Sequence, residues 1–274
     1  MPDWLIWPGL VLLGVGVGAY GTMIGAGGGF VLVPLLLLLY PDDPPELITS
    51  ISLAVVFCNA LSGTAAYLHQ RRVDLLAANA FAVATIPGAI AGALVVGLLP
   101  RDAFDVAFAV LLLLVSSFLI VRPAARIRQR SHRRGEVSRL LTDRSGDTYA
   151  YSYNLITGVV LSVAVGFLSS LLGIGGGIIH VPLMVQVLLF PAHVATATSH
   201  YVLMISALAG TLVHLVSGDL DGGYARTGAL AIGVLAGAQV GARLSVLVRG
   251  PSLIRLLAGA LILVALRLLV TPLI

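Results

Sequence analysis

The sequence predicts an all-α membrane protein that crosses the bilayer several times and consists of two diverged copies of one set of helices. Three observations predict this fold class. Of the 274 residues, 58% are hydrophobic and only 10% are charged, whereas soluble domains usually carry about 25% charged residues. Long uncharged runs alternate with short polar segments. Similar blocks of sequence recur in the same order in both halves of the chain.

The uncharged runs predict where the helices lie. Each run can hold one or more membrane helices of roughly 20 residues. The runs are 4–41, 47–70, 75–100 and 148–218. Backbone polar groups inside a bilayer are satisfied only in helices or closed barrels, and these runs are continuously apolar rather than alternating. We expect helices at 4–23, 29–40, 48–68, 76–99 and 104–121, then at 154–172, 177–190, 195–216, 225–247 and 252–270.

A hydrophilic segment divides the two sets of helices. Between Arg122 and Asp147 it holds eight arginines and three acidic residues. Such a segment could bind nucleic acid or anionic lipid, but arginine in excess beside membrane helices is typical of a cytoplasmic connector. We therefore predict a first transmembrane repeat at 1–121, an Arg-rich cytoplasmic linker at 122–150 and a second repeat at 151–274.

The repeat is visible as paired motifs about 148 residues apart. GAGGG at 25–29 corresponds to GIGGG at 173–177, and each leads into Val-Pro-Leu. Further pairs follow in order: Gly63-Thr64 with Gly210-Thr211, Val73-Asp74 with Leu220-Asp221, Gly88-Ala89 with Gly237-Ala238, and Gly92-Ala93 with Gly241-Ala242. Six such blocks in order are not expected by chance, so we interpret the chain as an internal duplication.

Charge and helix number predict an inverted duplication. Five segments per half, an odd number, place the second half upside down relative to the first, if each Gly-interrupted pair crosses twice. With the linker in the cytoplasm, the Arg71-Arg72 loop is inside, and both the acidic loops at 41–46 and 217–224 are outside. Both chain termini are then expected outside, with the N-terminal stretch forming the first membrane segment rather than a signal peptide.

The two glycine clusters are the strongest candidates for a binding site. A glycine inside a helix costs about 1 kcal/mol relative to alanine, so three in succession should unwind the segment within the membrane. The N–H groups that open the following short helix lack partners and lie at its positive dipole end, which suits an anion. Close packing of neighbouring helices is the alternative explanation. The candidate residues are Gly27, Gly28, Gly29, Gly175, Gly176 and Gly177.

A second group of candidates consists of polar side chains in apolar segments. The stretch Thr196-Ala197-Thr198-Ser199-His200 corresponds to 49–53 in the first half. Polar side chains in lipid face the protein interior, and ionisable ones are often functional. A neutral histidine within a helix contact, or an arginine that extends to the membrane surface, is the structural alternative. These candidates are Ser52, Thr198, Ser199, His200, His180 and Arg243.

Motifs for enzymes, metals and other cofactors are not found. Phe30 and Ile178 follow the glycines where a nucleotide-binding P-loop needs Lys and Ser or Thr. The chain lacks HExxH, and the Gly-Phe-Leu-Ser-Ser stretch at 166–170 is not a nucleophile elbow. Cys58 is the single cysteine, which excludes intrachain disulfides and thiolate clusters. We therefore expect no enzyme activity, no cofactor and no metal.

Several motifs together resemble the TauE/SafE family of sulfite and organosulfonate exporters, also called the toluene-sulfonate uptake permease family. They are GAGGGFVLVPLL, GIGGGIIHVPLM, ATSH, AGTLVHLVSGDLD and GAQVGARL, and they cover most of the chain outside the linker. The resemblance implies a small sulfur-containing anion as cargo, such as sulfite or a short sulfonate. Leu32 stands where the second half has His180, so the two repeats are not equivalent in detail.

The leading functional hypothesis is a secondary transporter of such anions in the cell membrane, an exporter that works by alternating access. Without an ATP-binding motif, transport is expected to be secondary or facilitated. The expected partners are the anion and the lipid bilayer, without nucleic acid, and the oligomeric state is open, a homo-oligomer included. An anion channel of the same architecture is the first alternative. An intramembrane enzyme is the second, although it would need a buried nucleophile and base.

Overall fold

The computed structural model describes residues 3–121, 136–248, 252, 259 and 262. Each predicted helix within these residues is present, and the helix expected at 252–270 falls largely outside them. The helices are α1 Asp3–Ile24, α2 Gly29–Leu39, α3 Pro45–His69, α4 Leu75–Val95 with the 3-10 turn η1 Val96–Leu98, α5 Arg101–Val121, α6 Leu155–Leu171, α7 Gly177–Gln186, α8 Ala192–Ser217 and α9 Tyr224–Leu247. The strands are β1 Glu136–Thr142 and β2 Thr148–Asn154.

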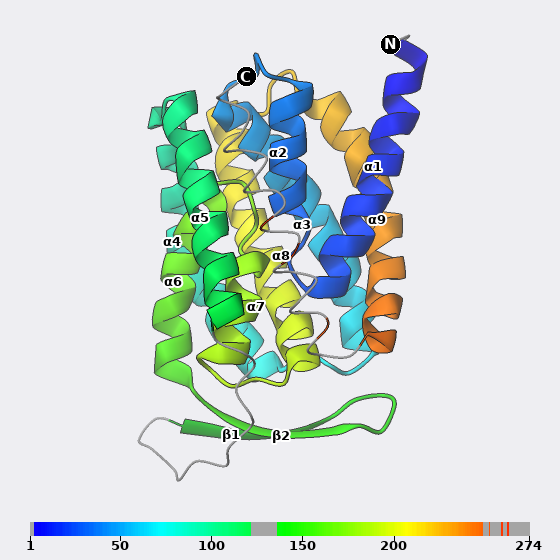
Figure 1. The fold of residues 1–274 in the computed structure, drawn as a ribbon, viewed down its shortest axis with the longest axis vertical. Coiled ribbons are helices and arrows are strands. Elements are labelled where there is room, and N and C mark those ends of the chain that lie inside the picture. The colour runs from blue at the N-terminus through cyan, green and yellow to red at the C-terminus, as the bar shows by residue number, and fades with distance from the viewer. Residues whose placement is uncertain (1–2, 122–135, 249–251, 253–258, 260–261, 263–274) are drawn as a thin grey trace.

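The helices form one bundle, and the two strands form a hairpin across one end of it (Figure 1). We call this end the hairpin end and the other the opposite end. Within the described residues, five helical segments are long and apolar enough to cross a membrane: Ile6–Ile24, Pro45–His69, Leu75–Leu98, Ala192–Ser217 and Tyr224–Leu247. The all-α polytopic fold class is thereby confirmed.

Helices α2 and α7 are too short to cross a bilayer. They contain 11 and 10 residues, or about 15–17 Å at 1.5 Å per residue, against a hydrocarbon core of about 30 Å. The chain enters through α1 from the opposite end and returns to that end through α2, while α6 and α7 do the same from the hairpin end (Figure 1). Each Gly-interrupted pair therefore turns back inside the bundle instead of crossing twice, which leaves the expected sides of the loops unchanged.

Helices that correspond in sequence run in opposite directions. The C-terminal end of α3 lies at the hairpin end, where Arg72 forms an ion pair of 3.2 Å with Asp143 between the strands. Helix α4 begins at the hairpin end, where Asp74 at its start pairs with Arg139 of β1. Its counterpart α9 begins at the opposite end, where Arg226 pairs with Asp43. Figure 1 shows α3 descending toward the hairpin and its counterpart α8 ascending from it.

At corresponding glycines, a helix of each half packs closely against a helix of the other half. A Cβ on Gly88 of α4 would lie 2.1 Å from the carbonyl oxygen of Val163 in α6. A Cβ on the corresponding Gly237 of α9 would lie 2.3 Å from the carbonyl oxygen of Val15 in α1. Both positions need glycine because the helix backbones touch, as is common where small residues pack in membranes. These glycines are paired motifs of the duplication, and each packs its helix against the opposite half.

The hairpin lies in a part of the chain that we predicted from the sequence to be mainly a linker. Its strands pair antiparallel, with Arg139 opposite Tyr151. Arg139 binds the fully buried carboxylate of Asp74 at 3.2 Å, and the Tyr151 hydroxyl donates to the same carboxylate at 2.7 Å. The rings of Tyr151 and Tyr153 pack on Phe190, with centroids 4.8 and 4.6 Å away. The hairpin thus contacts both halves, the α3–α4 loop of the first and the α7–α8 loop of the second.

Candidate functional site

The two glycine loops touch each other inside the bundle. Gly25, Gly27 and Gly28 have positive φ angles of 75–86°, and the corresponding Gly173, Gly175 and Gly176 have 69–89°, a backbone conformation that favours glycine. A Cβ on Gly29 would lie 2.8 Å from the carbonyl oxygen of Ile174, and one on Gly177 would lie 2.4 Å from that of Gly25. The structure therefore brings the six predicted glycines together at one crossing of two backbones, which we call the loop crossing.

Backbone donors at the loop crossing lack acceptors. The N–H groups of Gly29 and Phe30 open α2, and those of Gly177 and Ile178 open α7; within the described residues none of them has a hydrogen-bond acceptor. The first N–H groups of any helix have no acceptor within the helix, and they carry the positive end of its dipole. Two such helix starts meeting in a buried region can bind an oxyanion from two sides.

Ser52 and Ser199 hold the loops in place. The Ser52 hydroxyl donates to the carbonyl oxygen of Gly173 at 2.7 Å. The Ser199 hydroxyl lies 3.5 Å from the carbonyl oxygen of Gly25. Each serine is fully buried and contacts the loop of the other half. In this structure their hydroxyls position the backbone of the loops.

His200 belongs to a polar network beside the first loop. Its Nε2 lies 3.3 Å from the hydroxyl of Thr22, which also donates to the amide oxygen of Asn59 at 3.1 Å. The Asn59 amide nitrogen donates to the carbonyl oxygen of Gly27 at 3.0 Å. The Tyr67 hydroxyl donates to the carbonyl oxygen of Thr22 at 2.6 Å. The network therefore connects a predicted histidine to the first loop.

Sequence reasoning missed three members of this network, namely Thr22, Asn59 and Tyr67. Asn59 could have been found, because it is the only amide side chain within the interior of the uncharged run 47–70, and polar side chains in such runs face the protein interior. Thr22 lies three residues before Gly25, the first residue of the first glycine cluster. No pattern in the sequence indicates that either residue meets His200.

Hydroxyl groups without partners lie beside the second loop. Ser169 and Ser170 are fully buried, and within the described residues neither side-chain oxygen has a hydrogen-bond partner. A Cβ on Gly176 would lie 3.0 Å from the Ser169 oxygen. Buried polar atoms are nearly always paired, so unpaired ones indicate a place for water or a ligand. These two serines were also missed as site residues.

The three remaining predicted residues lie elsewhere. The Thr198 hydroxyl accepts from the backbone N–H of Asp74 at 3.0 Å, near the hairpin end. His180 lies within α7, where its Nε2 is 3.0 Å from the Ser162 hydroxyl and its ring packs near Phe81. Arg243 is exposed and lines a pocket of about 270 Å³ at the hairpin end. The side-chain contacts of Thr198, His180 and Arg243 described here lie away from the loop crossing.

Comparison with known proteins identifies the family. Residues 10–268 match the family described as Sulfite exporter TauE/SafE. The chain belongs to the TauE/SafE family. It is 34% identical over 261 residues to YunE of Bacillus subtilis (strain 168), a probable membrane transporter protein, covering 93% of this chain and 94% of that protein. It is 27% identical over 218 residues to MJ0441 of Methanocaldococcus jannaschii, also a probable membrane transporter protein, covering 78% and 74%. No solved structure matches.

The match places the described geometry in a family of membrane transporters. It confirms the resemblance drawn from the glycine motifs, and it covers both loops of the crossing as well as the linker between the halves. The multi-pass helical fold and the TauE/SafE match agree that the chain is a membrane transporter. In such a protein, a buried meeting point of two half-crossing helical pairs is where a cargo site is expected.

Proposed function

We propose that this TauE/SafE protein exports a small sulfur-containing anion, sulfite or a short organosulfonate, by secondary transport. The observation that carries the proposal is the loop crossing, where Gly29 and Gly177 bring two helix starts into backbone contact. Sulfite and sulfonate groups carry several oxygen acceptors on one sulfur. Backbone N–H groups from two directions and the unpaired hydroxyls of Ser169 and Ser170 offer the donors that such a group requires.

The surroundings of the loop crossing favour an anion over a cation. The uncharged run 148–218 contains no carboxylate that would repel an anion. The donors are backbone groups and hydroxyls rather than guanidinium groups, which suits a cargo that must also be released. Binding by preorganised dipoles in a buried site is strong enough for recognition without a buried fixed charge.

Alternating access is supported by the arrangement of the halves. Corresponding helices run in opposite directions. Each packs closely against the other half through a glycine: α4 through Gly88 against α6, and α9 through Gly237 against α1. An inverted repeat of this kind can open to either side by rocking one unit against the other around a fixed central site. We place the protein in the cell membrane with the hairpin end in the cytoplasm, because the segment from Arg122 to Asp147 is rich in arginine.

Counterflow in proteoliposomes tests the proposal. Purified protein is reconstituted with unlabelled sulfite inside, and the uptake of labelled sulfite against its gradient is measured, then repeated with a short alkyl sulfonate. A carrier gives saturable uptake with a transient overshoot. Flux without saturation or overshoot would show a channel instead. Overshoot for chloride or nitrate with none for sulfite or the sulfonate would contradict the proposed cargo class.

A further inference from the structure

Arg71 adopts a backbone conformation that its side chain disfavours. It lies two residues beyond the end of α3, with a φ angle of 56°, and its N–H donates to the carbonyl oxygen of Leu68 at 3.0 Å. This is the left-handed residue that commonly closes a helix, a place usually held by glycine. The corresponding residue of the second half is Gly218, with a φ angle of 79° at the end of α8.

The duplication thus provides an internal comparison for this turn. The same helix ending is made with glycine in one half and with arginine in the other. An L-amino acid in the left-handed region is strained, and asparagine or glycine relieves the strain. The turn itself therefore does not need an arginine. The side chain of Arg71 must contribute something that offsets the strain, and strained residues of this kind occur often at functional sites.

The Arg71 side chain lines a pocket between the helices and the hairpin. The pocket has a volume of about 570 Å³ and is lined by Leu68, His69, Arg71, Asp143, Arg144 and Gly146. Arg144 comes from the turn between β1 and β2 and lies against Nε2 of His69. The walls therefore come from the end of α3 on one side and from the hairpin turn on the other.

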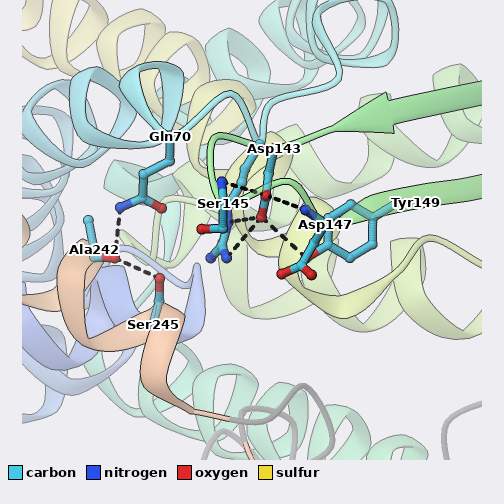
Figure 2. Close-up of polar contacts among 8 residues, drawn as sticks. Gln70, Asp143, Ser145, Asp147, Tyr149, Ala242 and Ser245 are labelled. Carbon is cyan, nitrogen blue, oxygen red and sulfur yellow. Dashed lines mark hydrogen bonds and ion pairs between the residues drawn. The ribbon is translucent and has the colours of Figure 1, made fainter.

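The charge left over in this pocket is positive. The carboxylate of Asp143 is occupied, because it pairs with Arg72 at 3.2 Å and accepts from the backbone N–H groups of Ser145 and Asp147 at 2.9 and 3.0 Å (Figure 2). Within the described part of the chain, neither Arg71 nor Arg144 has an acidic partner. Two exposed guanidinium groups thus share one concave pocket with a neutralised carboxylate.

We propose that this pocket binds an oxyanion between Arg71 and Arg144, at a site separate from the loop crossing. A guanidinium group presents a planar fork of donors that matches two oxygens of a sulfate, sulfite or phosphate group. The same chemistry could be supplied by a soluble oxyanion or by the phosphate of a lipid headgroup. A bound anion would offset the repulsion between the two arginines and would hold the hairpin turn to the end of α3.

Protection of a cysteine in the pocket tests the site directly. Leu68→Cys is made in a Cys58→Ala background, and the full-length protein is placed in nanodiscs of neutral lipid. The rate of modification by an uncharged thiol reagent is measured at increasing concentrations of sulfate or phosphate. Chloride at equal ionic strength is the control. We expect saturable protection by the oxyanions and none by chloride. A second set of nanodiscs contains phosphatidylglycerol and no added oxyanion. Protection in this set alone would assign the site to a lipid phosphate.

Substitution of Arg71 distinguishes binding from a structural role. Arg71→Gly relieves the backbone strain, so the variant should melt no lower than the parent in the absence of anion, yet the oxyanion concentration for half-protection should rise at least tenfold. Arg144→Gln should raise it similarly, and Arg71→Lys should raise it only a few-fold. Gly177→Ala, which alters the loop crossing, should leave the protection intact even if it abolishes transport. Equal protection by chloride, or unchanged half-protection in Arg71→Gly, would overturn the proposal.

Discussion

The hydroxyl of Ser52 donates a hydrogen bond of 2.7 Å to the carbonyl oxygen of Gly173, which opens the glycine cluster of the other half. The corresponding pair, Ser199 and Gly25, is separated by 3.5 Å. The same contact is therefore made twice in the duplicated chain, once at full strength and once at the limit of hydrogen bonding. Each half thus supports the loop of its counterpart at the loop crossing.

These two serines should differ in their contribution to stability. Ser52→Ala leaves the buried Gly173 carbonyl without its hydroxyl donor, which should lower the free energy of unfolding by about 1–2 kcal/mol. Ser199→Ala removes a longer and weaker contact and should have a smaller effect. Thermal unfolding of the purified variants in one detergent measures both. A larger loss for Ser199→Ala than for Ser52→Ala would contradict the geometry of the loop crossing.

Gly177→Ala should separate the two loops. Its new Cβ would lie 2.4 Å from the carbonyl oxygen of Gly25, so the backbones must move apart and the two helix starts no longer meet. We expect sulfite counterflow to fall at least tenfold and the melting temperature to drop. Gly16→Ala is the matched control, because a Cβ there meets nothing within 4 Å. Wild-type transport and melting in Gly177→Ala would show that the contact is unimportant.

Of the two intramembrane histidines, we expect His200 to affect transport and His180 to affect mainly stability. His200 contacts Thr22 in the network that reaches the first loop, whereas His180 contacts Ser162 between α6 and α7. His200→Gln should reduce transport more than tenfold with little change in melting temperature. His180→Gln should change mainly the melting temperature. Transport in vesicles and thermal unfolding are compared for both variants, and the reverse pattern would place the cargo pathway near His180 instead.

Docking of the hairpin should weaken at alkaline pH. Burial raises the pKa of the Tyr151 phenol above its ordinary value of 10.0, and the Asp74 carboxylate that accepts its hydrogen bond raises that pKa further. Burial raises the pKa of Tyr153 in the same direction. The folded protein keeps both protons while the unfolded chain loses them, so stability is unaffected below about pH 10 and falls as the pH rises above it.

The alkaline effect can be assigned to these two residues by substitution. Melting temperatures are recorded between about pH 9 and 11.5 for the parent and for the double variant Tyr151→Phe, Tyr153→Phe. The double variant should be less stable at neutral pH, because Asp74 loses a hydrogen bond of 2.7 Å. Its melting temperature should then depend less on pH. An equally steep fall in both proteins would show that other groups cause the dependence.

Membrane sidedness can be tested with cysteines at the two ends of the bundle. Asp42→Cys lies in the exposed α2–α3 loop at the opposite end, and Ser145→Cys lies in the exposed turn of the hairpin. Both are made in a Cys58→Ala background. If the hairpin faces the cytoplasm, an impermeant thiol reagent added to intact cells should label Asp42→Cys and not Ser145→Cys. Labelling of Ser145→Cys alone would reverse the orientation.

The sequence by itself determined which segments are helical, where the chain is duplicated and where the helices are interrupted. Each of these features depends on local chemistry. Uncharged runs of sufficient length have no alternative to helix in a bilayer, and the clusters at 25–29 and 173–177 cannot continue a helix at low cost. The family resemblance rested on the same segments. The helix expected at 177–190 ends earlier, at Gln186, where apolar composition gave no sign of the turn that follows.

The tertiary structure alone decided which of these parts meet. Thr22 and His200 are 178 residues apart, and their contact depends on how α8 packs against the first half. The loop crossing needs two half-length helical pairs to enter from opposite ends, and neither cluster specifies its partner. The hairpin was indicated only by weak alternation in EVSRLLT and TYAYSYN. Two strands are marginal by themselves, and this pair is stabilised by docking, through Asp74, Arg72 and Phe190, onto helices distant in sequence.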